Sequence, residues 1–244
     1  MSSVTLYHGM ASTCSKKVRL SLYEKGVAFE SRLLDLQKFE QHDPAYLAIN
    51  PNGVVPALVH DGRSVIESSI IAEYVDEAFE GPTLSPADPV ARARMRLWLR
   101  FSDEAAYPAI AAPTWQYMRH RAAKALEDQA ILARVPTAER RERWNKMAKG
   151  GYSDEEIEAA VVRMGACLDK LEAQLAETEW LAGDAFSLAD IAVLPFAVRI
   201  RNLKPELMTR PAVNRWLERA AERPSFARAL EFSEDPRAAE LPNI

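Results

Sequence analysis

The amino-acid sequence predicts an α/β domain at residues 1–80, a linker at 81–88 and an all-helical domain at 89–244. Three observations lead to this prediction. The chain of 244 residues has room for about 1.6 average domains. Short β-type runs alternate with helical patterns only in the first 80 residues, and three prolines and a glycine gather at 80–89, which is typical of a linker.

The first part of the α/β region predicts a strand, a helix and a second strand. Val4–Tyr7 is a short β-type run, and the loop Gly9–Cys14 leads into a helical pattern at about Ser15–Lys25. Gly26 follows where a glycine often ends a helix, because glycine adopts the left-handed backbone without steric cost. Phe29–Leu34 predicts the second strand.

A hairpin and a helix complete the α/β region. Ala57–His60 and Arg63–Ile66 flank Asp61-Gly62, and an Asp-Gly pair between two such runs is a strong sign of a β-hairpin. Glu67-Ser68 opens a helical pattern that ends near Phe79. The order is β-α-β, a connection that contains a helix, and then β-β-α, which favours a small layered α/β domain.

The rest of the chain predicts helices with recognisable starts. Asp88-Pro89 is an N-cap followed by proline in the first turn, and Ser153 and Ser187 each open a capping box or a variant of it. A further helix is expected at 211–223. In the helix after Ser153, apolar residues recur in steps of three and four, which predicts a core-facing stripe of Ile157, Val161, Met164, Leu168, Leu171 and Leu175.

Composition and charge exclude several classes of protein. The chain is 48% hydrophobic and 27% charged, as ordinary globular proteins are. Its net charge of −4 argues against nucleic acid as the main partner. Only Cys14 and Cys167 are present, which fits a reducing compartment better than a disulfide scaffold. We find no apolar run of about 18 residues and no secretory signal, so we expect a cytoplasmic protein with no membrane segment.

A polar segment between the first predicted strand and helix is the first candidate site. It reads Ser12-Thr13-Cys14-Ser15. Free N–H groups and the positive end of the helix dipole favour an anion at such a place, and hydroxyl or thiol groups there can donate a hydrogen bond to it. Cys14 could itself be a nucleophile, because helix N-termini lower the pKa of thiols. Plain capping of the helix explains the same residues.

Two further segments are candidates for binding a peptide-like ligand. Val55-Pro56 precedes the hairpin, and a cis bond there would leave the Val55 backbone free to pair with an extended ligand. Glu67-Ser68 lies at a helix start, where free N–H groups suit a carboxylate and Glu67 could pair with an ammonium group. An ordinary loop proline and an ordinary helix cap are the alternatives.

The order and spacing of these segments resemble those of the cytosolic glutathione transferases. The chain carries Ser-x-Cys-x-x-x-Val-Arg at 12–19, Asn-Pro-x-Gly-x-Val-Pro-x-Leu at 50–58 and Glu-Ser-x-x-Ile at 67–71. The helical half adds Phe186-Ser-Leu-Ala-Asp-Ile191 and Pro211-Ala-Val-Asn-Arg-Trp-Leu217. This resemblance implies a thioredoxin-like N-terminal domain, an all-helical C-terminal domain, glutathione as cosubstrate, no metal, and a homodimer.

The resemblance places the hydroxyl group that activates the glutathione thiol in the first polar segment. Ser12-Thr13-Cys14 is similar to the Ser-Ser-Cys stretch of zeta-class enzymes, and Ser12 also falls on the theta-class catalytic serine. The stretches Leu22–Gly26 and Lys38–His42 look like those of the bacterial β-aryl etherases, in which the active-site hydroxyl falls nearer Ser15. Ser12 and Ser15 are therefore both candidates for donating a hydrogen bond to the glutathione thiolate, with Ser12 ranked first.

The resemblance also implies how the rest of glutathione is held. Val55, before Pro56, matches the residue whose backbone pairs with the cysteinyl moiety, and Thr13 and Cys14 lie beside the thiol. Glu67 and Ser68 match the pair that holds the γ-glutamyl ammonium and carboxylate groups. The weaker candidates for the glycyl carboxylate are Lys38 and His42.

A helical insertion near 119–152 is a further likeness to the etherases, and its charge is unusual. Nine Lys or Arg and four Asp or Glu lie between Arg119 and Lys149, so this segment carries +5 and the rest of the chain −9. It could be a lid that steers anionic aromatic substrates, or only a solvated helical face. Tyr107 and Trp115 are expected to line the pocket for the electrophile.

The expected function is transfer of glutathione to an aromatic or unsaturated electrophile, with lignin-type β-aryl ethers as a specific substrate class. A hydroxyl donor and a helix N-terminus lower the pKa of a thiol, and the thiolate is the nucleophile. Three alternatives stay open. They are a zeta-like isomerase that does not consume glutathione, a deglutathionylase or reductase acting through Cys14, and a non-enzymatic glutathione-binding protein.

Overall fold

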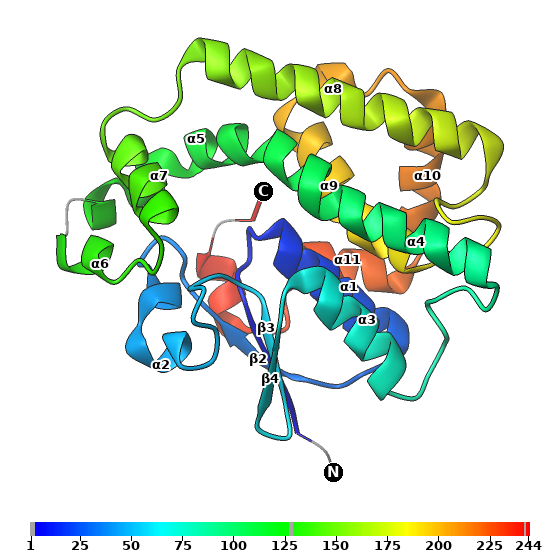
Figure 1. The fold of residues 1–244 in the computed structure, drawn as a ribbon, viewed down its shortest axis with the longest axis horizontal. Helices are drawn as coiled ribbons and strands as arrows, with labels where there is room; N and C mark the ends of the chain where they lie inside the picture. The colour runs from blue at the N-terminus through cyan, green and yellow to red at the C-terminus, as the bar shows by residue number, and fades with distance from the viewer. Residues whose placement is uncertain (1–2, 127–128, 242) are drawn as a thin grey trace.

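A small sheet with its helices and a larger group of helices lie against each other (Figure 1). This computed structural model describes residues 3–126, 129–241 and 243–244 of the chain. The sheet lies in the N-terminal part, and the part from Pro89 onward contains helices. The predicted fold class, a thioredoxin-like α/β domain followed by an all-helical domain, is confirmed.

The sheet has four strands in the order β2-β1-β3-β4. The central strand β1 (Val4–His8) pairs in parallel with β2 (Glu30–Leu33) and antiparallel with β3 (Ala57–His60). A tight turn at Asp61-Gly62, where both residues have positive φ, joins β3 to β4 (Arg63–Ile66). The predicted hairpin is therefore confirmed at both of its strands.

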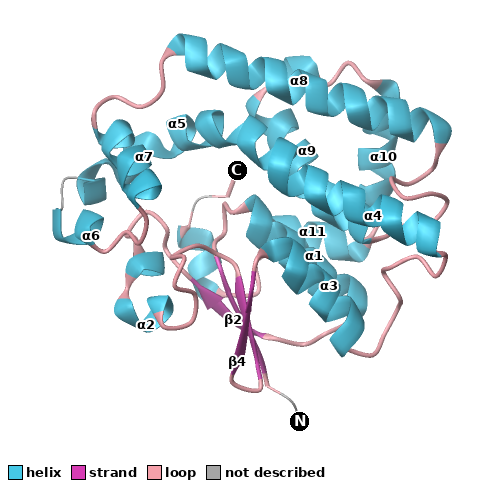
Figure 2. Cartoon of the chain, in the orientation of Figure 1, coloured by secondary structure: helices cyan, strands magenta, loops and turns pink. Residues whose placement is uncertain are grey.

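Two helices pack on one face of this sheet, α1 (Thr13–Lys25) and α3 (Ser68–Ala78) (Figure 2). The predicted start of α1 at Ser15 was wrong by two residues, because the Ser12 side chain accepts a hydrogen bond from the Ser15 N–H and so caps the helix earlier. Gly26 ends α1 with a φ of 74°, as predicted. The short helix α2 (Pro44–Leu47) lies in the connection to β3. The core between sheet and helices contains Val4, Leu6, Val18, Leu22, Leu58, Ile71 and Val75.

The second part contains α4 (Pro89–Phe101), α5 (Tyr107–Leu126), α6 (Gln129–Ala133), α7 (Ala138–Ala148), α8 (Asp154–Glu177), α9 (Leu188–Leu203), α10 (Pro211–Ala221) and α11 (Pro224–Glu231). A π-helical turn (Ser102–Ala106) joins α4 to α5, and short 3-10 helices lie at Glu40–His42, Pro205–Leu207 and Pro236–Glu240. The helix expected at 211–223 ends two residues earlier, at Ala221, and Pro224 begins the next helix, α11.

Helix α9 is the centre of the helical part, since almost all of its side chains are buried. It packs against α1, α4 and α5, so it joins the two domains. The predicted capping boxes at Ser153 and Ser187 are both present. The predicted stripe on α8 is buried from Met164 to Leu175 but only half-buried at Ile157 and Val161, near the start of the helix. In the described part of the chain, no helix is long and apolar enough to cross a membrane.

Candidate active site

A cavity of about 370 Å³ lies between the two domains. Its N-terminal wall is formed by the loop at 10–14, the loop after β2, residues 53–56, and Glu67-Ser68 at the start of α3. Helices α5, α7 and α9 form the opposite wall. All three polar segments singled out in the sequence therefore meet at one place, although the first and last are more than fifty residues apart.

The hydroxyl of Ser12 lies at this cavity, at the N-terminus of α1. Its oxygen accepts a hydrogen bond from the backbone N–H of Ser15 at 3.1 Å, which leaves its own proton free to donate. Ser15 lies outside the cavity lining, is fully buried, and accepts a hydrogen bond from the Gly9 N–H at 3.1 Å. This geometry favours Ser12 over Ser15 as a donor to a ligand in the cavity.

Cys14 and Thr13 also line the cavity. Burial raises the pKa of the Cys14 thiol, and the charge of Lys17 and a hydrogen bond from Ser68 offset only part of this effect. A thiol with a raised pKa is mostly protonated near neutral pH, so it is a poor nucleophile. The other cysteine, Cys167, is buried in α8, and burial raises its pKa to about 11, so this thiol is also mostly protonated near neutral pH.

Buried cations support the loop that carries Ser12. The Arg199 guanidinium, on α9, donates to the carbonyl oxygen of Ala11 at 2.5 Å and to the Thr114 hydroxyl at 3.1 Å. Lys16 and Arg199 both donate to the carbonyl oxygen of Ile244, at 2.8 and 2.7 Å. Burial lowers the pKa of Arg199 to about 10, so the side chain still carries its positive charge beside the cavity near pH 7.

The Val55-Pro56 peptide bond is cis, and both residues line the cavity. The preceding loop is fixed by two hydrogen bonds to the Val54 carbonyl oxygen, from the Tyr46 hydroxyl at 2.5 Å and the Asn50 side chain at 2.8 Å. These two hydrogen bonds hold the backbone next to Val55 in place.

Glu67 and Ser68 form the end of the cavity at α3. Glu67 has a φ of 68°, a conformation that non-glycine residues rarely adopt and that often marks a binding site. Asp103, in the π-helical turn, lines the same end and accepts a hydrogen bond from the buried Lys17 amine at 2.9 Å. Carboxylates can pair with an ammonium group, and the N–H groups at a helix N-terminus can bind a carboxylate. This end of the cavity can therefore hold both groups of one ligand.

The opposite end of the cavity contains buried polar atoms without hydrogen-bond partners. Within the described ranges, these are both ring nitrogens of His42, the side-chain oxygen of Gln41 and the side-chain nitrogen of Gln37. All three residues line the cavity, and His42 is only 2% exposed. Burial and the charges of Arg140 and Arg134 lower the pKa of His42 to about 4, so its ring is neutral near pH 7. Unpaired buried polar atoms are costly, which points to a ligand that pairs with them.

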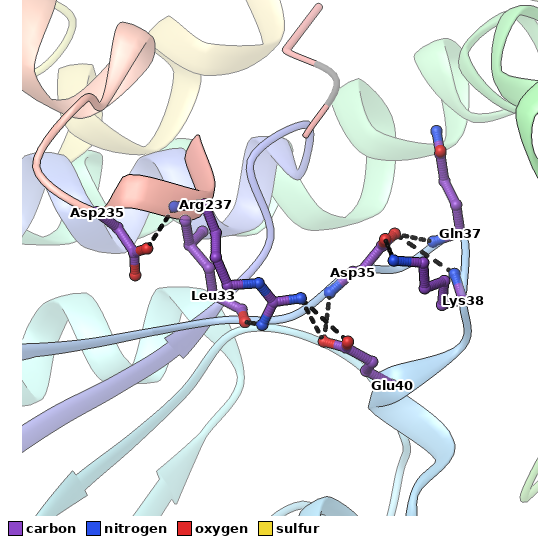
Figure 3. A network of polar contacts seen from close by, with 7 residues as sticks. All are labelled: Leu33, Asp35, Gln37, Lys38, Glu40, Asp235 and Arg237. Atoms are coloured by element: carbon purple, nitrogen blue, oxygen red, sulfur yellow. Dashed lines mark hydrogen bonds and ion pairs between the residues drawn. The ribbon is translucent and has the colours of Figure 1, made fainter. Parts of the chain in front are cut away.

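Lys38 lies outside this lining. Its amine pairs with Asp35 at 3.3 Å, and its side chain is 76% exposed (Figure 3). The loop itself is held by Arg237, from the C-terminal segment, which donates to the Leu33 carbonyl at 2.8 Å and pairs with Glu40 at 3.0 Å. Of these two residues that the sequence singles out, His42 lines the cavity and Lys38 does not.

The basic insertion lies over the N-terminal domain (Figure 1). Trp144 of α7 packs on Phe39 with ring centroids 4.5 Å apart, and Arg140 donates to the Asn52 carbonyl at 2.9 Å. Arg134 pairs with Asp43 at 2.7 Å. Of the nine basic residues counted above, Arg119, Arg140 and Arg143 line the cavity. The side chains of Arg121, Lys124, Glu127 and Asp128 lie outside the described part of the structure.

Tyr107 and Trp115 both line the half of the cavity under the insertion. Trp115 packs edge-on against Trp144 at 4.8 Å. Sequence reasoning missed several other residues that line the cavity, which include Asp103, Ile110, Thr114, Met147 and Arg199. No local pattern marks them, because they come from helices whose inner faces look like any other core-facing stripe.

Comparisons with known proteins agree on one family. Residues 6–83 match the family model "Glutathione S-transferase, N-terminal domain", and residues 154–219 match "Glutathione S-transferase, C-terminal domain". The chain is 33% identical to Protein LigF of Sphingobium sp. over 95% of this chain and 94% of that protein. It is 28% identical to a maleylacetoacetate isomerase of Pseudomonas aeruginosa over 92% and 94% of the two chains.

A solved structure gives the same result. The crystal structure of the beta-etherase LigF from Sphingobium sp. strain SYK-6 superposes with a TM-score of 0.87 at 32% identity. The match covers 95% of this chain and all of that one. The similarity therefore extends over both domains and the cavity between them.

Proposed function

This chain belongs to the glutathione S-transferase family, and we propose that it uses glutathione to cleave aromatic β-aryl ethers. One observation carries the proposal. The Ser12 hydroxyl lies in a cavity whose N-terminal wall has polar groups at both ends and whose helical wall is aromatic. The similarity to a beta-etherase over 95% of the chain supports the choice of an ether as substrate.

Glutathione fits the N-terminal wall of the cavity. Glu67 and Ser68 take the γ-glutamyl ammonium and carboxylate groups, and the Val55 backbone pairs with the cysteinyl moiety. His42 donates to the glycyl carboxylate at the end where its nitrogens have no protein partner in the described structure. This orientation places the thiol at Ser12, at the positive end of α1.

The reaction is a nucleophilic displacement. Ser12 donates a hydrogen bond that stabilises the thiolate, and the thiolate sulfur attacks the carbon that bears the aryloxy group. The thiol proton passes to water when the thiolate forms. The C–S bond then forms as the C–O bond breaks, and the aryloxy oxygen leaves as a phenolate that takes a proton back from water. Glutathione is the only co-reactant, and it is abundant in its thiol form in a reducing cytoplasm, where we place the protein.

The alternatives predict different products from the same assay. An isomerase would convert a maleyl compound without consuming glutathione, and one relative carries such a name. A mechanism through Cys14 would need a reactive thiol, whereas burial raises the pKa of this one. A non-enzymatic protein would bind glutathione and turn nothing over.

We expect the purified protein to convert a model β-aryl ether and glutathione into a thioether and a phenol in equal amounts. The control substrates are chlorodinitrobenzene, which reports general transferase activity, and a maleyl compound. Chromatography of products and titration of remaining thiol are the measurements. Isomerisation of the maleyl compound without loss of thiol, and no thioether from the ether, would contradict the proposal.

We also propose that the protein is a homodimer, as is typical of the family, through the outer face of α3 and α4. This face exposes Ile70, Val90 and Leu97, whose side chains are 55%, 60% and 66% accessible. Arg96 of α4 pairs with Glu73 of α3 at 2.8 Å, so the two helices present one continuous surface. Exposed apolar residues grouped on neighbouring helices are a common sign of a protein interface.

Leu97→Arg is expected to convert the dimer into a monomer, because it buries an unpaired charge in an apolar contact. Sedimentation of the variant and the wild type over the same concentration range measures the change. Val162→Arg, at a residue of α8 that is 72% exposed, is the matched control and should leave the mass unchanged. A Leu97→Arg protein that sediments as the wild type does would place the interface elsewhere.

A further inference from the structure

The electrophile half of the cavity contains an arginine that the displacement reaction above does not use. Arg143 of α7 lines this half together with Tyr107 of α5. The other lining residues of α5 and α7 include the apolar Ile110, Trp115, Met118, Trp144 and Met147, and also Arg119 and Arg140. An arginine at the wall of an aromatic cavity is a suitable partner for an anionic ligand.

Arg143 and the Tyr107 hydroxyl act on each other. Burial raises the pKa of Tyr107, while the nearby charge of Arg143 acts in the opposite direction. Both residues line the cavity, and a guanidinium group and a phenol can each donate a hydrogen bond to an anion. The pair therefore offers N–H and O–H donors side by side.

The charge of Arg143 is only weakly compensated by its other partner. Its guanidinium pairs with Glu139, one turn earlier in α7, at 3.2 Å. The Glu139 side chain is 82% exposed, whereas that of Arg143 is 30% exposed. Water screens exposed pairs of this kind, so a ligand in the cavity can compete for the guanidinium.

Helix α7 is held firmly enough to position this group. The residue after Arg143, Trp144, is buried against Phe39 of the N-terminal domain. Arg140, one turn earlier, is hydrogen-bonded to the Asn52 carbonyl. A binding group fixed by its neighbours loses little conformational freedom when the ligand arrives.

We propose that Arg143, together with Tyr107, binds a carboxylate carried by the aromatic electrophile, so that the protein selects aromatic substrates with an acidic substituent. The inference rests on the proposed function for the identity of this half of the cavity as the electrophile site. A guanidinium matches a carboxylate with two parallel N–H groups, and the phenol supplies a third donor. A neutral ester of similar size leaves these donors without an anionic partner.

The test uses unreactive ligands, so that it does not depend on ether cleavage. Calorimetry on protein saturated with S-methylglutathione compares dimethoxybenzoate with its methyl ester. We expect the wild type to bind the acid about tenfold or more tightly than the ester, and R143Q to lose most of this preference. R143K should keep part of the preference, and R143E should reverse it.

The matched control is Arg163→Gln, which removes an exposed arginine from α8 and should keep the wild-type preference. Affinity for glutathione, measured on the same samples, reports whether each variant is folded. If R143Q does not fold, Tyr107→Phe removes the third donor and should lower the preference instead.

Three results would overturn the inference. The first is equal binding of the acid and the ester by the wild type. The second is a preference for the acid over the ester that survives in R143Q. The third is an equal loss of turnover in R143Q with acidic and with neutral ethers. The last result would mean that Arg143 acts on the leaving phenolate and not on a carboxylate. Failure of ether cleavage alone would count against the proposed function and leave the charge preference as a separate result.

Discussion

Replacing Ser12 by alanine is expected to lower kcat/KM for glutathione transfer by about 10- to 100-fold, the usual effect of losing one hydrogen bond to a charged group. Without the hydroxyl, the pKa of bound glutathione should rise toward the value of a free thiol, about 8.5. The limb of the pH–rate profile that reports thiolate formation should therefore move to higher pH. Steady-state kinetics over a range of pH, with spectroscopic titration of the bound thiolate, measure both effects.

Two companion variants separate activation from helix capping. The Ser12 oxygen also caps α1, and a lost cap costs about 1 kcal/mol with alanine but only a few tenths with glycine. Ser12→Gly should therefore lose the same activity with less loss of stability. Ser15→Ala removes a buried hydroxyl outside the cavity and should leave the pH profile in place. A Ser12→Ala profile identical to that of the wild type, or a shift only in Ser15→Ala, would assign activation to Ser15.

Replacing Asp190 by alanine is expected to lower the free energy of unfolding by about 3–5 kcal/mol, as is usual when a buried charge and its partners are separated. One carboxylate oxygen accepts hydrogen bonds from the Leu181 N–H at 3.0 Å and the Trp216 indole at 2.9 Å. The other accepts from the Ser187 N–H at 3.0 Å. Alanine leaves all these buried donors unpaired at the start of α9, and urea unfolding of the two proteins measures the loss.

The loss should depend on pH in a defined direction. Burial raises the folded-state pKa of Asp190 to about 6, above an unfolded value of about 3.9. The folded state therefore binds more protons between these values, and the stability that this group contributes is largest below pH 4 and falls as the pH rises through 6. The difference in free energy of unfolding between the wild type and Asp190→Ala should therefore decrease by up to about 3 kcal/mol over that range.

A nearby residue supplies the control for Asp190. Asp184 is exposed in the loop before the same helix, so Asp184→Ala should change the stability little at any pH. His8 and His42 also titrate at abnormal pKa values, but both remain in the two proteins, so their effects cancel in the difference. If the difference in free energy of unfolding between the wild type and Asp190→Ala increases as the pH rises from 4 to 6, the folded state holds Asp190 in its charged form.

The sequence by itself determined several of the boundaries of helices and strands. The hairpin at Asp61-Gly62, the end of α1 at Gly26 and the starts of α8 and α9 at Ser153 and Ser187 all match the prediction. The physical reason is that turns and caps form their hydrogen bonds within about four residues, so the responsible side chains stand next to one another in the sequence. The order and spacing of the polar segments then sufficed for the family.

Only the tertiary structure decided which side chains reach the cavity. Ser12 and Ser15 are the same residue type in one short segment of the sequence. In the structure, however, Ser12 lines the cavity, whereas the Ser15 hydroxyl accepts a hydrogen bond from the Gly9 N–H. Arg143 reaches the cavity because α7 packs on a loop about a hundred residues earlier in the chain, through Trp144 and Phe39. Such contacts depend on long-range packing of apolar surfaces, and no short-range pattern in the sequence records which polar groups that packing brings together.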